Sequence, residues 1–318
     1  MKNNTIKKYH KKIGINKTKE NKTKENKKTK KNKKNISFKK VNCSPKINKK
    51  KFTCFSDKNL HKMRDIWNIR HPEYAIHTND SYEIWKALKQ YYTKMCNKES
   101  CWIKQIAKNT PMEKELLDDF SPESPIEWKT NPNEWLTSTD ITNVMRQYEH
   151  TYSCFEFLGP SPIDFNTKKL RGNCVWEELC HFSINEQLKK KKTKIGIIFN
   201  TDPHYKSGEH WISLFINIKK GKIFFFDSAG ATAPSQIKQF VEKVIEQGKQ
   251  LKRPIYFNFD ENYPTEHQYK NTECGIYSLF FIVHMLEDKI TGDYLKDHIL
   301  KDEYMQQFRN VYFNKKLF

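Results

Sequence analysis

Residues 274–286 read CGIYSLFFIVHML and are apolar on almost every side of the helix that they would form. A helix on a protein surface has one apolar face and one polar face, whereas a helix that is apolar all round has to be buried from every direction. Its longest apolar run, LFFIV at 279–283, is far too short to cross a membrane. The segment therefore predicts the central helix of a packed domain, which the rest of the chain has to cover.

Other segments predict a sheet that packs around this helix. The runs rich in β-branched and aromatic residues, which favour strands, are 194–200, 211–218, 222–227 and 254–259. The turn Lys-Lys-Gly at 219–221 is so short that the strands on either side of it should form an antiparallel hairpin. The segment 235–247 predicts an amphipathic helix. We therefore expect an α+β fold with a small mixed, mostly antiparallel sheet around one buried helix.

Residues 53–133 predict a mainly helical N-terminal region. Ser81 is placed to cap a helix whose apolar residues recur at helical spacing. Four prolines then break up the last part of this region, which predicts a linker or an irregular wrap. A second unit is expected over 134–318, and its first helix begins with the capping-box-like pair Thr137 and Asp140.

Residues 1–52 predict a disordered basic tail. Residues 1–51 contain 21 lysines against Glu20 and Glu25, a local charge of +19, so most of the chain's net charge of +21 lies there. Such a composition has too little apolar surface to offset the chain entropy lost on ordering. Two interpretations remain open, because a lysine-rich tail could tether the protein to nucleic acid or another polyanion, or could serve only to keep it soluble.

The remaining composition indicates a soluble protein made in a reducing compartment. The opening MKNNTIKKYHKK is not followed by the apolar stretch of a secretory signal. Eight cysteines show no C-x-x-C pair and no dense framework, so we expect free thiols. Cys174, Cys180 and His181 suggest zinc, but a structural zinc site needs four ligands and no second pair is evident. Cys174 and Cys180 are instead expected to be small buried side chains.

Cys274 is the candidate nucleophile. It begins the buried helix next to Gly275, where unpaired backbone N–H groups and the positive end of the helix dipole stabilise a thiolate. His210 directly precedes the strand 211–218, and Asp227 ends the strand that folds back against it. The hairpin register brings Asp227 beside His210 with a small bulge or shift. The sequence therefore predicts a nucleophile, a general base and a carboxylate that orients the base.

Gln268 lies six residues before Cys274 in the predicted loop that leads to the helix. Its amide and the Cys274 backbone N–H could together form an oxyanion hole, although a lone glutamine in a polar loop is more often just solvated. His204 and His267 do not begin a strand that faces an acidic residue, so we expect them on the surface or in loops. His284 lies nearly three turns into the helix, too far from Cys274 to act as base, and is expected to be a core histidine.

Two sequence blocks resemble a known family. They are GEHWISLFINIKKGKIFFFDSAG at 208–230 and HQYKNTECGIYSLFF at 267–281. They are similar to the His-Trp, Asp and Gln-to-Cys-Gly blocks of the SUMO (ubiquitin-like-protein-specific) protease superfamily, most closely its viral branch with the polyprotein-processing protease of African swine fever virus. FNTD at 199–202 and DEYMQQF at 302–308 add to the viral likeness. Where the viral branch has asparagine as the third catalytic residue, this chain has Asp227, as SUMO proteases do.

The resemblance implies a papain-like, SUMO-protease-like cysteine protease core over 134–318. The catalytic residues that it implies are His210, Asp227, Gln268 and Cys274. It also implies that Trp211 walls a narrow tunnel that admits only Gly-Gly, because any Cβ would clash there. Without a metal or organic cofactor, such a thiol endopeptidase of a large DNA virus would cleave after Gly-Gly-X-like sites in virion structural or core precursors. It would act in the virion and in the viral factory of the host cytoplasm.

Two alternatives remain open. A deconjugating protease would use the same chemistry to remove SUMO or ubiquitin-like modifiers from host proteins. A non-enzymatic, basic virion protein would bind nucleic acid on a dead protease scaffold, although the intact set of four residues argues against it. The partners expected are viral precursor proteins as substrates and, on the tether interpretation of the tail, nucleic acid, with no membrane. The sequence does not indicate an oligomeric state.

Overall fold

The structure is a computed structural model that describes residues 42–47 and 52–315. The predicted tail up to residue 41 lies outside the described residues. Short 3₁₀ helices are η1 (Pro45–Ile47), η2 (Pro72–Tyr74) and η3 (Ile126–Lys129). The α-helices are α2 (Asp57–Arg70), α3 (Ser81–Tyr92), α4 (Glu99–Ala107), α5 (Pro111–Leu117), α6 (Ser138–Thr151), α7 (Glu177–Cys180), α8 (Ile184–Lys189), α9 (Ser235–Lys249), α10 (Cys274–Leu286), α11 (Gly292–Asp297) and α12 (Asp302–Tyr312).

A mixed sheet runs through the C-terminal part of the chain in the order β1-β3-β4-β5-β6, with β2 also beside β3. The strands are β1 (Phe155–Phe157), β2 (Ser161–Pro162), β3 (Lys194–Asn200), β4 (Trp211–Asn217), β5 (Lys222–Phe226) and β6 (Asn258–Glu261). The β3–β4 and β4–β5 ladders are antiparallel, and β1, β2 and β6 join in parallel. Asn217 pairs with Lys222 across the turn, so the predicted hairpin is confirmed.

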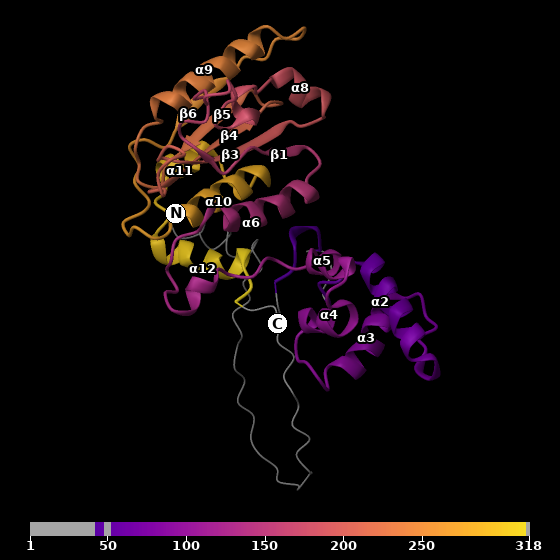
Figure 1. Cartoon of the computed structure of the whole chain (residues 1–318). Helices are drawn as coiled ribbons and strands as arrows, with labels where there is room; N and C mark the ends of the chain where they lie inside the picture. The colour runs from indigo at the N-terminus through magenta and orange to yellow at the C-terminus, as the bar shows by residue number, and fades with distance from the viewer. Residues whose placement is uncertain (1–41, 48–51, 316–318) are drawn as a thin grey trace, which may run out of the picture. The chain divides into compact units, whose positions relative to one another are not determined.

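The sheet is covered on both faces, with α9 on one side and α10 on the other (Figure 1). On one face, Ile197, Leu214 and Phe225 belong to the core that includes the apolar face of α9. On the other face, Phe215 and Phe226 contact Phe281 of α10, with ring centroids 6.5 and 5.0 Å apart. Because both faces are covered, the strands are apolar at successive positions, and β4 is buried along its whole length.

Helix α10 has the central position that its composition predicts. All of its residues except Met285 are buried. Its burial against the sheet places its first residue, Cys274, beside the open end of the β4–β5 hairpin. Among the residues that the structure describes, no helix is both long and apolar enough to span a bilayer.

The N-terminal region is helical, as expected, and has a core of its own. Fully buried side chains such as Phe55 and Trp102 form a hydrophobic cluster within it. Asp80 rather than Ser81 caps α3, because the Asp80 carboxylate accepts the Glu83 N–H. Part of the predicted linker is α5, whose proline occupies the helix start, where a missing N–H costs no hydrogen bond. The predicted domain division near residue 133 stays a prediction.

Residues 42–47 correct the predicted boundary of the disordered tail. The Ser44 N–H donates to the Asp119 carbonyl at 3.0 Å. Asn42 and Asn314, at opposite ends of the described chain, exchange hydrogen bonds of 2.7 and 3.0 Å. Composition alone could not reveal these contacts, because the partners lie far away in the sequence.

The strand predicted at 254–259 is also corrected, since β6 begins at Asn258. The Ile255 N–H donates instead to the Gly248 carbonyl at the end of α9, at 3.0 Å. A Cβ on Gly248 would lie 2.5 Å from the Ile255 carbonyl oxygen, so the chain closely follows the helix here. The β-rich composition of this segment reflects side chains packed against the α9 core.

Candidate active site

The β4–β5 hairpin brings His210 and Asp227 together. His210 lies one residue before β4, and Asp227 one residue after β5. The Nε2 atom of His210 is 2.7 Å from Oδ1 of Asp227. The ladder ends at the pair Ser213 and Phe226, so the two side chains meet across the open end of the hairpin. The predicted contact is therefore present in the structure.

Asn262, which sequence reasoning did not single out, holds Asp227 in place. It is fully buried, accepts the Asp227 N–H at 2.9 Å and donates from Nδ2 to the Asp227 carbonyl at 2.8 Å. The Ala229 N–H also donates to Oδ1 of Asp227 at 2.9 Å. These bonds fix the carboxylate that faces His210. The only signal in the sequence was a polar residue just after a strand.

Cys274 is a buried free thiol at the first position of α10. Burial disfavours the charged His210 ring, but hydrogen bonds and charge interactions with Asp227 and Cys274 outweigh it and raise the pKa of His210 to about 10. Because Nε2 is bound to Asp227, Nδ1 is the ring nitrogen left for the thiol. The raised pKa keeps His210 protonated near neutral pH, and the first backbone N–H groups of α10 lie at the end of the helix that carries the Cys274 sulfur.

Gln268 lies on the loop between β6 and α10 and is bound to Ser228, the residue that follows Asp227. Its Oε1 accepts the Ser228 hydroxyl at 2.7 Å, and its backbone N–H donates to the Ser228 carbonyl at 2.9 Å. Its Nε2 donates to the Lys270 carbonyl. The adjacent residues Asp227 and Ser228 thus position the base and the amide together. The oxyanion role of Gln268 stays a prediction.

Trp211 and Leu136 form one wall of a groove. The Trp211 Nε1–H donates to the Leu136 carbonyl at 2.9 Å. A Cβ on Gly275 would approach the Leu136 side chain to 3.0 Å, so Leu136 packs directly on the residue after the nucleophile. The groove has a volume of about 760 Å³, and Trp135, Trp176 and Asp202 also line it. The tunnel role of Trp211 stays a prediction.

His204, His267 and His284 form contacts that do not involve Cys274. His267 lies in a loop, as expected, but it is fully buried rather than on the surface, and its Nδ1 accepts the Leu300 N–H at 3.1 Å. Burial lowers its pKa to about 4 and keeps it neutral. His284 is the core histidine expected, since it is buried and its Nδ1 bonds a carbonyl of its own helix at 2.8 Å. His204 pairs with Asp164 at 2.6 Å.

The expectation that all cysteines are free thiols is wrong. The disulfides are Cys43–Cys54, Cys96–Cys101 and Cys174–Cys180, with Cα separations of 5.0, 6.1 and 6.3 Å. Cys154 and Cys274 are free. The fold brings each pair within the Cα range that a disulfide needs, which sequence spacing without a recognised motif does not reveal.

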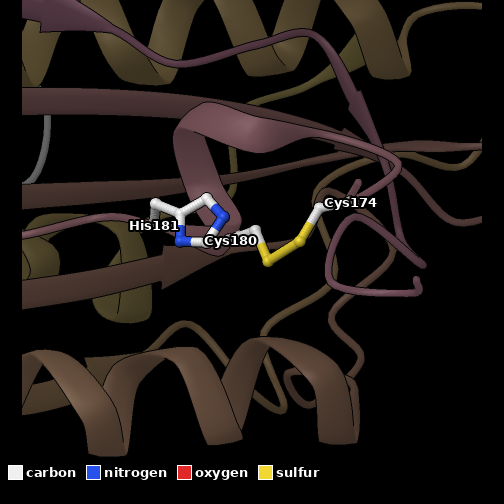
Figure 2. A group of neighbouring side chains, drawn as sticks. All are labelled: Cys174, Cys180 and His181. Carbon is white, nitrogen blue, oxygen red and sulfur yellow. A yellow bond between two sulfur atoms is a disulfide. The ribbon is translucent and has the colours of Figure 1, made fainter. Parts of the chain in front are cut away.

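Figure 2 shows the cluster for which the sequence suggested zinc. Cys174 and Cys180 are bonded through their sulfur atoms, and His181 follows on the next residue. Lys168 Nζ lies 3.0 Å from the Cys174 sulfur, and the backbones of these two residues form an isolated antiparallel β-bridge. Zinc binds thiolates, which the two bonded sulfurs do not provide. The disulfide joins the loop that contains Cys174 to α7. The next residues of that loop, Val175 and Trp176, line the groove.

Comparison with known proteins relates the chain to cysteine proteases. Residues 176–317 match the Ulp1 protease family, C-terminal catalytic domain. A thiol protease of Acanthamoeba polyphaga mimivirus is 27% identical over 295 residues, which cover 85% of this chain and 92% of the relative. A protein of African swine fever virus called SUMO-1 cysteine protease is 27% identical over 247 residues, which cover 73% and 88%.

A solved structure supports the same fold. The crystal structure of the African swine fever virus protease matches this chain with a TM-score of 0.60 at 21% identity, over 86% of this chain and 95% of that one. The predicted protease fold is therefore confirmed. The match extends beyond the catalytic domain, since it covers most of both chains.

Proposed function

We propose that this chain, a cysteine protease whose residues 176–317 are a Ulp1-type catalytic domain, is a viral endopeptidase that cleaves after glycine-rich, Gly-Gly-X-like sites in virion precursor proteins. The observation that carries the proposal is the contact of His210 with both Asp227 and Cys274 at the start of α10. This constellation supplies nucleophile, base and orienting group for acyl transfer.

The reaction follows from these positions. The Cys274 thiolate attacks the carbonyl carbon, and the oxyanion that forms accepts hydrogen bonds from the Cys274 N–H and the Gln268 amide. Protonated His210 gives its proton to the leaving amine, and a thioester joins the acyl group to Cys274. His210 then takes a proton from water, the hydroxide attacks the thioester carbonyl, the C–S bond breaks with the sulfur leaving as the Cys274 thiolate, and the carboxylic acid product is released beside protonated His210. Asp227 keeps the imidazole oriented throughout.

The groove wall at Trp211 supports the proposed preference for glycine. The Trp211 indole donates a hydrogen bond to the Leu136 backbone carbonyl, and the Leu136 side chain lies directly on Gly275. A substrate chain that passes this wall to reach Cys274 would have little room for a Cβ, and glycine has none. This crowding supports selection for two glycines before the cleaved bond.

Virion precursors are proposed as substrates because the relatives named above include proteases of large DNA viruses. The place of action would be the virion and the viral factory in the host cytoplasm. The lysine-rich segment at the N-terminus would then hold the enzyme near packaged nucleic acid through counterion release. Its residues up to 41 lie outside the described structure.

Deconjugation of SUMO or a ubiquitin-like modifier is the second candidate. The observation that favours it is the name of the African swine fever virus relative, which is called a SUMO-1 cysteine protease. The chemistry is identical, because these modifiers also end in a carbonyl that the thiolate can attack. The two functions differ only in the protein that binds outside the catalytic centre.

The test is incubation of the purified protein with candidate virion precursors and, separately, with SUMO and ubiquitin conjugates. Mass spectrometry reads the new termini, and the Cys274→Ala protein is the matched control. We expect new termini after Gly-Gly in the precursors, formed by the parent protein alone. Release of modifiers without precursor cleavage would replace the proposal with the second candidate, and cleavage by both proteins would indicate a contaminating protease.

A further inference from the structure

A buried ion pair directly before the nucleophile plays no part in the mechanism above. Glu273 stands at the N-cap of α10 with an exposed fraction of 0%, and Arg309 of α12 has one of 5%. The Arg309 Nε–H donates to the Glu273 carboxylate at 2.9 Å. A buried ion pair is weak evidence for stability, because its desolvation offsets most of its attraction. Its place beside Cys274 suggests another role.

The rest of the guanidinium binds two separate chain segments. Besides the Glu273 carboxylate, its N–H groups reach the carbonyls of Glu134 at 2.8 Å, Thr272 at 3.0 Å, and Pro132 and Asn133 at 3.3 Å. An arginine has five N–H donors in a rigid plane, and here both terminal nitrogens and Nε are engaged. The Arg309 guanidinium also lies over the Trp128 ring, 4.4 Å from its centroid. The side chain is therefore held at a fixed orientation.

Those two segments are the two sides of the reaction centre. Thr272 and Glu273 lead directly into Cys274. Residues 132–134 lead into Leu136, which packs on Gly275 and accepts the Trp211 N–H. A single guanidinium thus sets the spacing between the nucleophile and the groove wall.

We propose that Arg309 is a positioning residue for the reaction, which holds the groove wall in register with Cys274 and neutralises the Glu273 carboxylate beside the developing thiolate. The wall part of this inference rests on the proposed function, because it assumes that the acyl side of the substrate binds along Trp211. The part about the Glu273 charge does not rest on the proposed function. An uncompensated carboxylate would oppose the Cys274 thiolate whatever the substrate is.

The first test compares Arg309→Lys with Arg146→Lys, a matched change at an exposed arginine on α6. Lysine keeps the positive charge but lacks the planar fork that holds the four carbonyls. With a fluorogenic Gly-Gly-X peptide, we expect kcat/KM of Arg309→Lys to fall roughly 10- to 100-fold, mainly through KM, as for a small misplacement of binding groups. Arg146→Lys should stay within about twofold of the parent.

The second test reads the charge without any substrate. Iodoacetamide alkylates Cys274 at a rate that follows its thiolate fraction. We expect the alkylation profile of Arg309→Met to move to higher pH, and that of Glu273→Gln/Arg309→Met to return to the parental position while KM stays raised. The double variant buries no unpaired charge, so it should fold even if Arg309→Met does not. In that case the alkylation profile of the double variant is compared with that of Glu273→Gln.

Parental kcat/KM in a folded Arg309→Lys protein would overturn the positioning role, as would an equal loss in Arg146→Lys. An unshifted alkylation profile in Arg309→Met would overturn the electrostatic role. If only the other two variants fold, the electrostatic role is overturned when Glu273→Gln and the double variant show the same alkylation profile and the parental KM. If the parent cleaves no glycine peptide, the proposed function fails by itself. The alkylation profiles still decide the charge part of the inference.

Discussion

The His210 imidazole is bound through Nε2 to Oδ1 of Asp227, 2.7 Å away. The two residues face each other at the open end of the β4–β5 hairpin, beyond the last paired residues of its ladder. This contact and that with Cys274 raise the pKa of His210 to about 10, against the effect of burial. The folded-state pKa lies above the ordinary value of 6.5, so the interaction stabilises the fold fully below that pH. Its contribution is lost as the pH rises through about 10.

Asp227→Asn should retain partial activity, because an amide oxygen can still accept the Nε2–H of His210. We expect kcat to fall roughly 10- to 100-fold, as for weakened acid–base catalysis. Loss of the carboxylate charge lowers the pKa of His210, so the alkaline limb of kcat/KM should move to lower pH. Profiles between pH 6 and about 11 measure this. An unmoved alkaline limb would contradict the charge interaction, and complete inactivity would show that the charge is indispensable.

Cys274→Ala should abolish peptide cleavage while the protein remains folded. Alanine removes only the buried sulfur, so the free energy of unfolding should fall by about 1 kcal/mol. Thermal unfolding and cleavage of a Gly-Gly-X peptide measure the two effects. Cys154→Ala, at the other free cysteine, is the control and should keep its activity. Loss of the fold in Cys274→Ala would indicate a structural cysteine.

Gln268→Ala should lower kcat by about 10²- to 10³-fold with little change in KM, as expected when one oxyanion donor is lost. Gln250→Ala, at the exposed end of α9, is the matched control and should resemble the parent. Steady-state kinetics on the same peptide measure both variants. A change in KM alone would assign Gln268 to substrate binding instead.

Alkylation without reductant should modify Cys154 and Cys274 and leave the other six cysteines unmodified, because those six form disulfides. Cys274 should react faster, since the proposed function makes it the nucleophile, next to His210 and at the start of α10. Peptide mapping by mass spectrometry before and after reduction measures this. Modification of Cys174 or Cys180 in the unreduced protein would contradict the disulfide that joins the groove loop to α7.

Deletion of residues 1–41 should leave peptide cleavage unchanged and sharply weaken binding to DNA or RNA. The deleted segment carries 17 lysines and two glutamates, a net +15 of the chain's +21. The cut spares Asn42, which bonds to Asn314, and Cys43, which bonds to Cys54. Fluorescence anisotropy at increasing salt should show the tail-dependent binding disappear steeply. Equally tight binding by the truncated protein would contradict a tether, and loss of cleavage would give the tail a catalytic role.

The sequence by itself determined the elements and the order of the chemical groups. The all-apolar segment 274–286 could form only a buried helix, and the short turn at 219–221 could join its strands only as a hairpin. From these followed the positions of Cys274, His210 and Asp227. A helix or a hairpin can be predicted from the sequence because each depends on residues that are only a few positions apart.

The tertiary structure alone decided which distant residues meet. It buried His267 beneath Leu300, shifted the last strand because Ile255 bonds to the end of α9, and paired six cysteines. It also placed Arg309 against Glu273, 36 residues away in the sequence. Neither composition nor periodicity encodes such contacts, because each depends on how complete elements pack, and packing is a property of the whole core.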